Sequence, residues 1–323
     1  MRLILAVLFC FWFAPALLAQ EFTFIPKGVF SSSVKHESLS WSDTLVSHRN
    51  RQPNAVADLL QLDLAQDQLA GGLNYQMTQQ TVDLLYGVTD QWNFGLQSSY
   101  IRYTRKSTLV NSSPANQDLT DYVASVSSKQ VSGLGDTQLY LHYRHFYTDY
   151  AQLVSGFFYQ EPTGHVEYNQ SSPMNLGTGL RRMGYRLIWD GFFSQTRLYT
   201  HSVAQIGFDG PGVTLGQDGK RHKLKGGVAN QASVEAIHQL GLFHYGAGAG
   251  FFFEPVHIVG KHDVRDGQLS VDAWLQIGIG NLAWLEKGPV SLPWTGSLQV
   301  KQAYRGNNVP AGQRMIAKLT LYF

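Results

Sequence analysis

Apolar and polar residues alternate almost strictly over the last ten positions of the chain, residues 314–323. In an extended chain, one face would hold Met315, Ala317, Leu319, Leu321 and Phe323. The other face would hold Arg314, Lys318, Thr320 and Tyr322, with Ile316 as its one apolar member. This period of two predicts a β-strand that lies between an apolar and a polar environment and ends on an aromatic residue.

The same alternation recurs along the chain and predicts about twelve strands. The expected strands before the terminal one are Phe22–Val34, Leu69–Tyr86, Trp92–Tyr103, Gly133–Arg144, Leu153–Gln160, Leu180–Trp189, Phe192–Val203, Gly227–Gln239, Leu242–Glu254, Gln268–Gly278 and Pro293–Tyr304. In Gln268–Gly278, Leu269, Val271 and Ala273 alternate with Ser270 and Asp272. Such a strand fits either a soluble sandwich or a membrane barrel, so the connections have to distinguish the two folds.

The connections alternate between long polar segments and short turns. The expected long segments are Lys35–Asp67, with a short helix over Ala55–Leu64, Arg105–Ser132, Glu161–Asn175, Gly207–Lys225 and Pro255–Arg265. The expected short turns are Gly87–Gln91, Tyr147–Tyr150 and Asp190-Gly191. Outer-membrane barrels have this asymmetry, with long loops outside the cell and short turns in the periplasm. The chain is therefore predicted to be all-β, a transmembrane antiparallel up-and-down β-barrel whose termini lie on the same side.

The first residues have the order of a secretory signal peptide. Met1-Arg2 precedes an apolar run from Leu3 to Phe13, and small residues lead up to Ala19. The apolar run is shorter than the ~20 residues that a spanning helix needs. We therefore predict a signal peptide over residues 1–19, cleaved after Ala19, and a single barrel domain over residues 20–323, located in the cell outer membrane.

The composition agrees with an exported barrel. Charged residues make up 15% of the chain and aromatic residues 13%, which is little charge and much aromatic content for a soluble enzyme. Cys10 is the one cysteine and falls in the predicted signal peptide, so the mature protein is expected to lack thiols, disulfides and a cysteine-linked lipid. With a formal net charge of +2, no nucleic-acid partner is expected.

Three short motifs carry a resemblance to a known family. They are Ser132-Gly-Leu-Gly-Asp136 with the strand that continues to Arg144, Gly87-Val-Thr-Asp90-Gln-Trp92 with the strand that continues to Leu96, and Leu176-Gly-Thr-Gly179. They resemble the outer-membrane protein family named for the meta pathway of phenol degradation, over roughly residues 70–323. The resemblance implies a β-barrel channel or transporter, and the family's name implies hydrophobic aromatic substrates. The sequence departs from the family at His142, where a basic residue is usual, and over Lys35–Asp67, which has no counterpart.

The strand that ends on Phe323 also resembles the closing strand of bacterial outer-membrane barrels, whose terminus serves as an assembly signal. This resemblance implies the barrel-assembly machinery as a partner through Phe323. Outer-membrane lipid and lipopolysaccharide are the other expected partners, besides a small-molecule solute. The basic run Lys220–Lys225 is expected to be a solvated loop tip or a contact for lipopolysaccharide phosphates.

Polar positions of the predicted strands supply the candidate lumen residues. They are Asp136, Tyr140, His142, Arg144, Asp272, Trp274 and Lys318. Asp136 follows two glycines where a loop re-enters the rim, so a structural corner is the expected role, with a substrate-facing role as the alternative. Gly246, Gly248 and Gly250 are expected to clear space in the lumen opposite lipid-facing alanines.

The sequence offers little sign of catalysis or bound cofactors. Among the eleven histidines, His201 is expected near an external loop, and His238 and His244 flank a turn. None lies with a Ser or Asp in an enzyme-like motif, so neither a catalytic residue, a metal site nor a cofactor is expected. The leading hypothesis is passive uptake of small, hydrophobic or aromatic compounds. The alternative is a barrel plugged by Tyr140, Arg144 and Trp274, with a structural or lipid-hydrolase-like role at its rim.

Overall fold

The computed structural model describes residues 24–47, 50–53, 70–110, 128–164, 174–215, 221–255, 257–259, 262–265, 267–281 and 293–323. The predicted signal peptide and the helix expected over Ala55–Leu64 lie outside these residues. Within the described part of the chain, no helix is long and apolar enough to cross a membrane.

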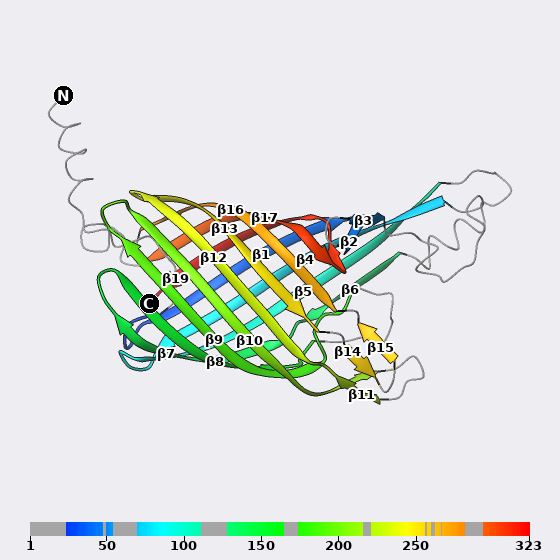
Figure 1. Ribbon diagram of the computed structural model, residues 1–323, viewed down its shortest axis with the longest axis horizontal. Coiled ribbons are helices and arrows are strands. Elements are labelled where there is room, and N and C mark those ends of the chain that lie inside the picture. The colour runs from blue at the N-terminus through cyan, green and yellow to red at the C-terminus, as the bar shows by residue number, and fades with distance from the viewer. Residues whose placement is uncertain are drawn as a thin grey trace, which may run out of the picture.

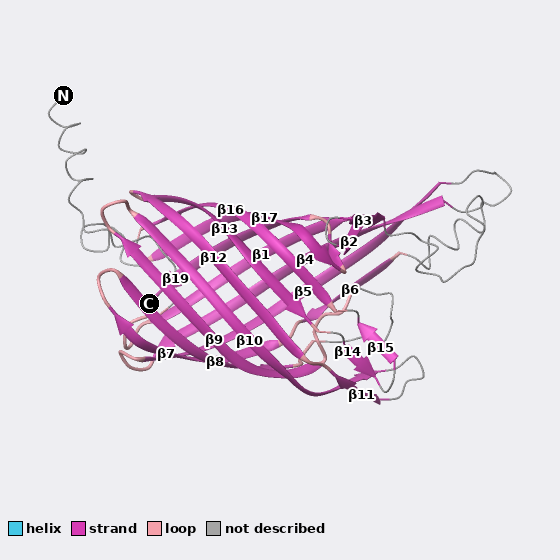
Figure 2. Ribbon diagram, viewed as in Figure 1, coloured by secondary structure: helices cyan, strands magenta, loops and turns pink. Residues whose placement is uncertain are grey.

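Twelve antiparallel strands form a closed barrel, as Figures 1 and 2 show. They are β1 (Phe30–Trp41), β4 (Ala70–Gly87), β5 (Trp92–Val110), β7 (Thr137–Tyr147), β8 (Ala151–Glu161), β9 (Leu180–Phe193), β10 (Leu198–Leu215), β12 (Val228–Leu240), β13 (Phe243–Glu254), β16 (Gln268–Gly280), β17 (Trp294–Asn307) and β19 (Gln313–Tyr322). Each strand pairs with the next one in this series, and β19 pairs with β1. The predicted up-and-down barrel is confirmed.

The terminal strand closes the barrel on the first one. Its register with β1 runs from Tyr322 opposite Ser31 to Gln313 opposite Ser40. The ladder extends through the last residue, because the Phe323 N–H donates to the Phe30 carbonyl at 2.7 Å and the Phe30 N–H donates to the Phe323 carbonyl at 3.1 Å. Closure leaves no barrel strand with an unpaired edge, which an apolar surrounding requires.

The two faces of the strands differ as the alternation predicts. In β16, Val271, Leu275 and Ile277 are exposed on the outer face, whereas Asp272 and Trp274 are buried on the inner face. β19 repeats the pattern, with Met315 and Leu319 exposed and Thr320 and Tyr322 buried. The barrel therefore has an apolar outer wall and a largely polar lumen, the arrangement of a transmembrane barrel.

Short turns gather at the end of the barrel that holds the C-terminus (Figure 1). Gly241-Leu242, Thr148–Tyr150 and Ser194–Arg197 are three of these turns. We call this the periplasmic end, following the rule for outer-membrane barrels. The opposite, extracellular end carries the additional strands β2 (Asp43–Ser47), β3 (Asn50–Pro53), β6 (Lys129–Leu134), β11 (Arg221–Lys225), β14 (His257–Val259), β15 (His262–Arg265) and β18 (Val309–Pro310).

Several segments predicted to be loops are strands. The loop Lys35–Asp67 was wrong in its first part, because β1 continues to Trp41 and β2 and β3 follow. The first barrel strand accordingly begins at Phe30 and not at Phe22. Both faces of β1 are rich in hydroxyl and charged side chains, so its alternation is weak in the sequence. Likewise β5 runs on to Val110 and β10 to Leu215, and β6, β11, β14 and β15 replace parts of the other long loops.

The predicted Asp190-Gly191 turn is also wrong. Both residues belong to β9, and the chain turns at Ser194–Arg197 instead. Asp190 tolerates this place because its carboxylate accepts hydrogen bonds from Gln152 and from Tyr199 inside the lumen. The shift also places His201 near the periplasmic turn and not near an external loop, contrary to our expectation.

The difference between the two faces of β16 can be tested by charge insertion. Ala273 lies on the outer face opposite Ala249 of β13, so Ala273→Arg should cost about 2–4 kcal/mol of folding free energy if it faces mid-bilayer. Gln276→Arg is the matched control, because Gln276 lines the lumen. Urea unfolding of the two variants in liposomes measures the difference. Equal destabilisation by both substitutions would show that the faces are assigned incorrectly.

Candidate functional site in the barrel lumen

Two chambers occupy the lumen. The outer chamber, toward the extracellular end, has a volume of about 510 Å³, and the inner chamber, toward the periplasmic end, about 470 Å³. Five residues line both chambers and mark where they meet: Lys35, Gln231, Ser233, Gln299 and Ile316. The two chambers thus adjoin inside the barrel, and each has the size that small-molecule sites have.

Ion pairs line one side of the outer chamber. Glu37 Oε2 lies 3.3 Å from Lys35 Nζ, and its Oε1 lies 3.2 Å from Arg314 Nε. Farther along the wall, Lys301 Nζ lies 2.8 Å from Asp272 Oδ2 and 5.4 Å from the centre of the Trp274 ring. Arg314 and Lys301 are thus paired with carboxylates on neighbouring strands and Lys35 with one on its own strand, so this wall of the chamber is charged.

The inner chamber combines aromatic and polar groups. The Tyr140 hydroxyl donates to Asp83 Oδ1, and Arg186 Cζ lies 5.9 Å from the Tyr140 ring centre. Arg186 Nε donates to Gln205 Oε1 at 2.8 Å. Hydrogen bonds from β7 to β4 and from β9 to β10 therefore fix polar groups of this chamber.

Glycines allow three lumen rings to lie flat against the wall. A Cβ at Gly95 would lie 2.1 Å from the Tyr140 ring, and one at Gly248 would lie 2.3 Å from the Trp274 ring. At Gly156, a Cβ would lie 2.5 Å from the His142 ring. The expectation that Gly248 clears lumen space is confirmed, and the space is occupied by Trp274.

A buried carboxylate lies beside the inner chamber. Asp190 is fully buried and accepts hydrogen bonds from Gln152 Nε2 at 2.6 Å and from the Tyr199 hydroxyl. His201 Nδ1 lies 2.6 Å from Asp190 Oδ1. Tyr199 and His201 both line the chamber. The hydrogen bonds of this cluster join β8, β9 and β10 beside it.

The segment before β1 crosses the periplasmic mouth of the lumen. Ile25 is fully buried and packs in one cluster with four inward-facing residues, Leu85, Tyr140, Phe158 and Tyr322. Phe24 packs with Val154 of β8 and Ile188 of β9. With the oxygen and nitrogen of its side-chain amide exchanged, Asn93 accepts a hydrogen bond from the Ile25 N–H at 2.7 Å and donates one to the Ile25 carbonyl at 3.1 Å.

Backbone contacts hold the same segment in place. The Gly28 N–H donates to the Gly87 carbonyl at 2.8 Å, and the Gly87 N–H donates to the Val29 carbonyl at 2.9 Å. A Cβ at Gly87 would lie 1.9 Å from the Pro26 carbonyl oxygen, so this close approach requires glycine. Arg144 Cζ lies 4.5 Å from the centre of the Phe24 ring, a cation–π contact. Phe24 and Ile25 therefore form an apolar barrier on the periplasmic side of the inner chamber.

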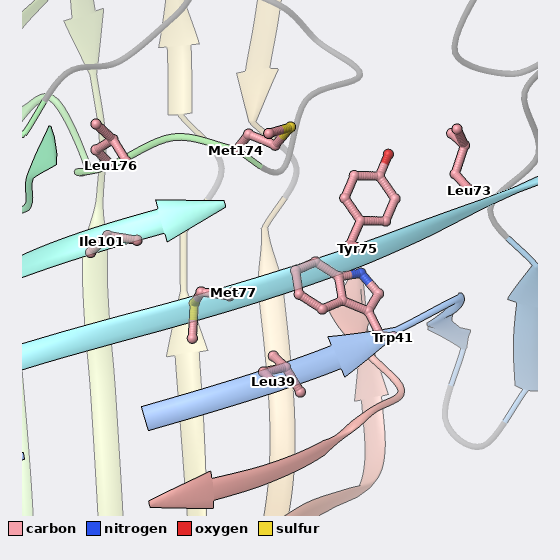
Figure 3. Close-up of a cluster of buried hydrophobic side chains, with 8 residues drawn as sticks. All are labelled: Leu39, Trp41, Leu73, Tyr75, Met77, Ile101, Met174 and Leu176. Carbon is pink, nitrogen blue, oxygen red and sulfur yellow. The ribbon is translucent and has the colours of Figure 1, made fainter. Parts of the chain in front are cut away.

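An apolar cluster lies inside the extracellular end. Its members are Leu39, Trp41, Leu73, Tyr75, Met77, Ile101, Met174 and Leu176 (Figure 3). The Trp41 and Tyr75 rings stack at a centroid distance of 5.2 Å and an interplanar angle of 12°. Leu39 also lines the outer chamber, so the cluster adjoins the internal space.

The structure distributes the predicted lumen residues over four places. Tyr140, His142 and Lys318 line the inner chamber, and Asp272 and Trp274 line the outer one. Arg144 lies at the barrier, where it also donates to the Asp90 carbonyl at 2.5 Å. Asp136 lines neither chamber. Its carboxylate accepts hydrogen bonds from Thr178 N at 2.7 Å and from Gly164 N at 3.2 Å, so it joins two connecting segments as a corner.

The sequence reasoning missed several lumen residues. Lys35 and Glu37 lie in the segment that was assigned to a loop, although Ser31, Ser33, Lys35 and Glu37 follow one another at a period of two. Arg186 was missed within a correctly predicted strand, where it follows Arg182 at the same period. Reading strand faces by position parity would have found all three charged groups.

The described residues also bring a serine and a histidine together on the outer wall. His145 Nε2 lies 2.8 Å from Ser155 Oγ, and the Tyr143 and His145 rings lie perpendicular to each other at a centroid distance of 5.0 Å. A hydrolase would need a third group to orient the histidine, and no described hydrogen bond joins His145 to a carboxylate. Nor do the described residues contain a group of three or more His, Cys, Asp or Glu side chains that could hold a metal ion.

No protein-family model and no curated protein matches the chain. Among solved structures, the crystal structure of an outer membrane channel from Pseudomonas putida F1 is similar, with a TM-score of 0.63 and 11% sequence identity. The match covers 94% of this chain and 99% of that one. The KdgM porin matches with a TM-score of 0.41 and 7% identity, over 90% of this chain and 97% of that one, which is too low to support an inference. The first similarity shows the fold, and the chain is folded as an outer-membrane β-barrel.

Proposed function

We propose that the protein is an outer-membrane channel for the passive uptake of small, hydrophobic or aromatic compounds. The observation that carries the proposal is the pair of chambers inside a closed barrel, which adjoin at the five residues that line both. The resemblance to the family named for the meta pathway of phenol degradation supports aromatic compounds as cargo. The outer-membrane channel of similar fold supports transport as the role of such a barrel.

The apolar cluster at the extracellular end gives such a compound its first contact. Trp41 and Tyr75 present stacked rings beside Met77, and aromatic and thioether groups bind flat apolar molecules well. All three lie on the inner face of strands that lead to the outer chamber. A compound that displaces part of this cluster would therefore move directly into the lumen.

The barrier of Phe24 and Ile25 is the last obstacle that a solute meets on its way through the lumen to the periplasm. The barrier contacts inward-facing residues of six barrel strands, so a solute has to pass it or move it. Because the contacts are mainly apolar, small apolar molecules should cross the barrier more easily than hydrated ions. A low basal ion conductance is the expected property of the unmodified channel.

Removing the barrier should raise the conductance. Phe24→Ala combined with Ile25→Ala leaves the strand ladder intact and widens the periplasmic mouth, so single-channel currents in planar bilayers should increase. Val88→Ala is the matched control, because Val88 is an exposed apolar residue in the neighbouring turn. If the double variant and the control conduct like the wild type, the limiting constriction lies elsewhere in the lumen.

The aromatic cluster can be tested by uptake. Trp41→Ala with Tyr75→Ala should reduce the uptake of radiolabelled phenol into expressing cells, while the uptake of a small sugar stays the same. Tyr100→Ala is the control, because Tyr100 is an exposed aromatic residue on the outer face of β5. All variants should keep the different gel mobility of heated and unheated protein, which reports an intact barrel. Phenol uptake that is independent of the protein would contradict the proposed function.

The second candidate is a lipid hydrolase at the periplasmic rim, which would have to use the His145–Ser155 pair. If this role is real, the purified protein should release fatty acid from phospholipid micelles, and Ser155→Ala should abolish the release. Without the carboxylate that would orient His145, we expect no hydrolysis above the level of Ser155→Ala. Hydrolysis that depends on Ser155 would make the enzyme the better assignment.

A further inference from the structure

The charged side chains that line the two chambers have partners within the protein. In the outer chamber, the lysine and arginine side chains form ion pairs with carboxylates. The charged residues of the inner chamber are Lys35, Asp83, Arg186, Glu235 and Lys318. Each of these has a hydrogen bond, an ion pair or another interaction with a group of the wall. Because these contacts already engage the charged groups, the polar groups that remain to bind a solute are uncharged.

Five uncharged side chains near the place where the chambers meet differ from the charged ones. Gln231, Ser233 and Gln299 line both chambers, and Gln276 and Ser297 line the inner one. Within the described part of the chain, none of these five side chains makes a hydrogen bond with another group of the protein. We call them the junction set. Their amide and hydroxyl groups are donors and acceptors that can bind a molecule inside the lumen.

The strand register gathers the junction set around β13. Ser233 of β12 lies opposite Gly250 of β13, and Gln276 of β16 lies opposite Gly246. Gln299 of β17 is in turn the direct partner of Gln276. Because β13 has glycine at these inward positions, it places no side chain of its own between the polar groups of β12 and those of β16 and β17. One small molecule can therefore contact both groups.

Apolar groups adjoin the junction set. The Trp274 ring lies over the glycines of β13 and lines the outer chamber. Ile316 lines both chambers and is the direct partner of Gln299. Lys35 also lines both chambers, and its Nζ lies 3.3 Å from Glu37 Oε2, so its charge is paired. This part of the lumen thus combines uncharged hydrogen-bonding groups with apolar contact surface.

We propose that the junction set binds neutral aromatic compounds that carry a hydroxyl or carbonyl group, such as aromatic alcohols. Gln231 and Gln299 hydrogen-bond the polar group, while Trp274 and Ile316 contact the ring. This inference rests on the proposed channel function and names the chemistry of the compounds that it selects. An amide both donates and accepts, as a hydroxyl does, and it has no charge to attract a carboxylate. A hydrocarbon analogue leaves the amides unpaired, so the site should reject it.

Fluorine NMR on the protein in lipid nanodiscs tests the site. After correction for partition into empty nanodiscs, the wild type should bind para-fluorobenzyl alcohol about tenfold more tightly than para-ethylfluorobenzene, the effect of one or two neutral hydrogen bonds. Gln231→Leu with Gln299→Leu should remove this preference. Gln76→Leu with Gln80→Leu is the matched control, because both residues are exposed on the outer face of β4. Equal binding of the two compounds by the wild type would overturn the inference.

A second variant and a third compound complete the test. Gln231→Ala with Gln299→Ala removes the same amides without adding apolar volume, and it replaces the leucine variant if that one lacks the heat-dependent gel mobility of an intact barrel. A folded variant that keeps the preference for the alcohol would disprove the site. Para-fluorobenzoate should bind the wild type more weakly than the alcohol. Tighter binding of the carboxylate would show that charge and not the amides controls the site.

Uptake separates the site from the channel function. If the alcohol binds through Gln231 and Gln299, but expressing cells take up radiolabelled benzyl alcohol no faster than cells without the protein, the site stands and the channel function fails. If the protein accelerates uptake while the glutamine variants bind the alcohol like the wild type, the channel function stands and the site is disproved.

Discussion

Hydrogen-bond closure of the backbone is the constraint on which the rest of this structure depends. In an apolar surrounding every N–H and C=O of a spanning strand needs a partner within the protein, and a closed ladder provides it. The pairing of β19 with β1 completes that ladder as far as Phe323. Once the ring is closed, the period of two assigns each side chain to lipid or to lumen. The polar positions are thereby collected in one enclosed space.

Enclosure explains why so many charged side chains in the lumen form ion pairs. A charged group inside a barrel of this width is partly shielded from water, so it is stable only beside an opposite charge or a suitable hydrogen-bond partner. The Arg182 guanidinium illustrates this at the extracellular end. It lies 2.6 Å from Asp209 and 2.5 Å from Glu254, and the three groups join strands β9, β10 and β13. The ion pairs of the lumen thus contribute to the stability of the wall.

The alternation predicted most barrel strands because their outer faces are strongly apolar, as in Phe243–Glu254. The prediction failed where the outer face of a strand is not clearly apolar. β1 has Ser38 and Ser40 on its outer face, so its continuation was mistaken for a loop, and Lys35 and Glu37 were lost with it. Asp190-Gly191 has the composition of a turn, and only the distant partners Gln152 and Tyr199 explain why it is a strand. The barrier formed by Phe24 and Ile25 depends on contacts across the whole lumen, which no local pattern encodes.

The glycines beneath Tyr140, His142 and Trp274 have a consequence for how such channels diversify. Each ring lies flat because the facing residue has no side chain, so a single added methyl group at Gly95, Gly156 or Gly248 would tilt a ring toward the central axis. The bore can then change without any change in strand number, register or loop length. Barrels with this same framework could therefore differ in the size of molecule they admit through one-residue exchanges in the wall, leaving assembly untouched.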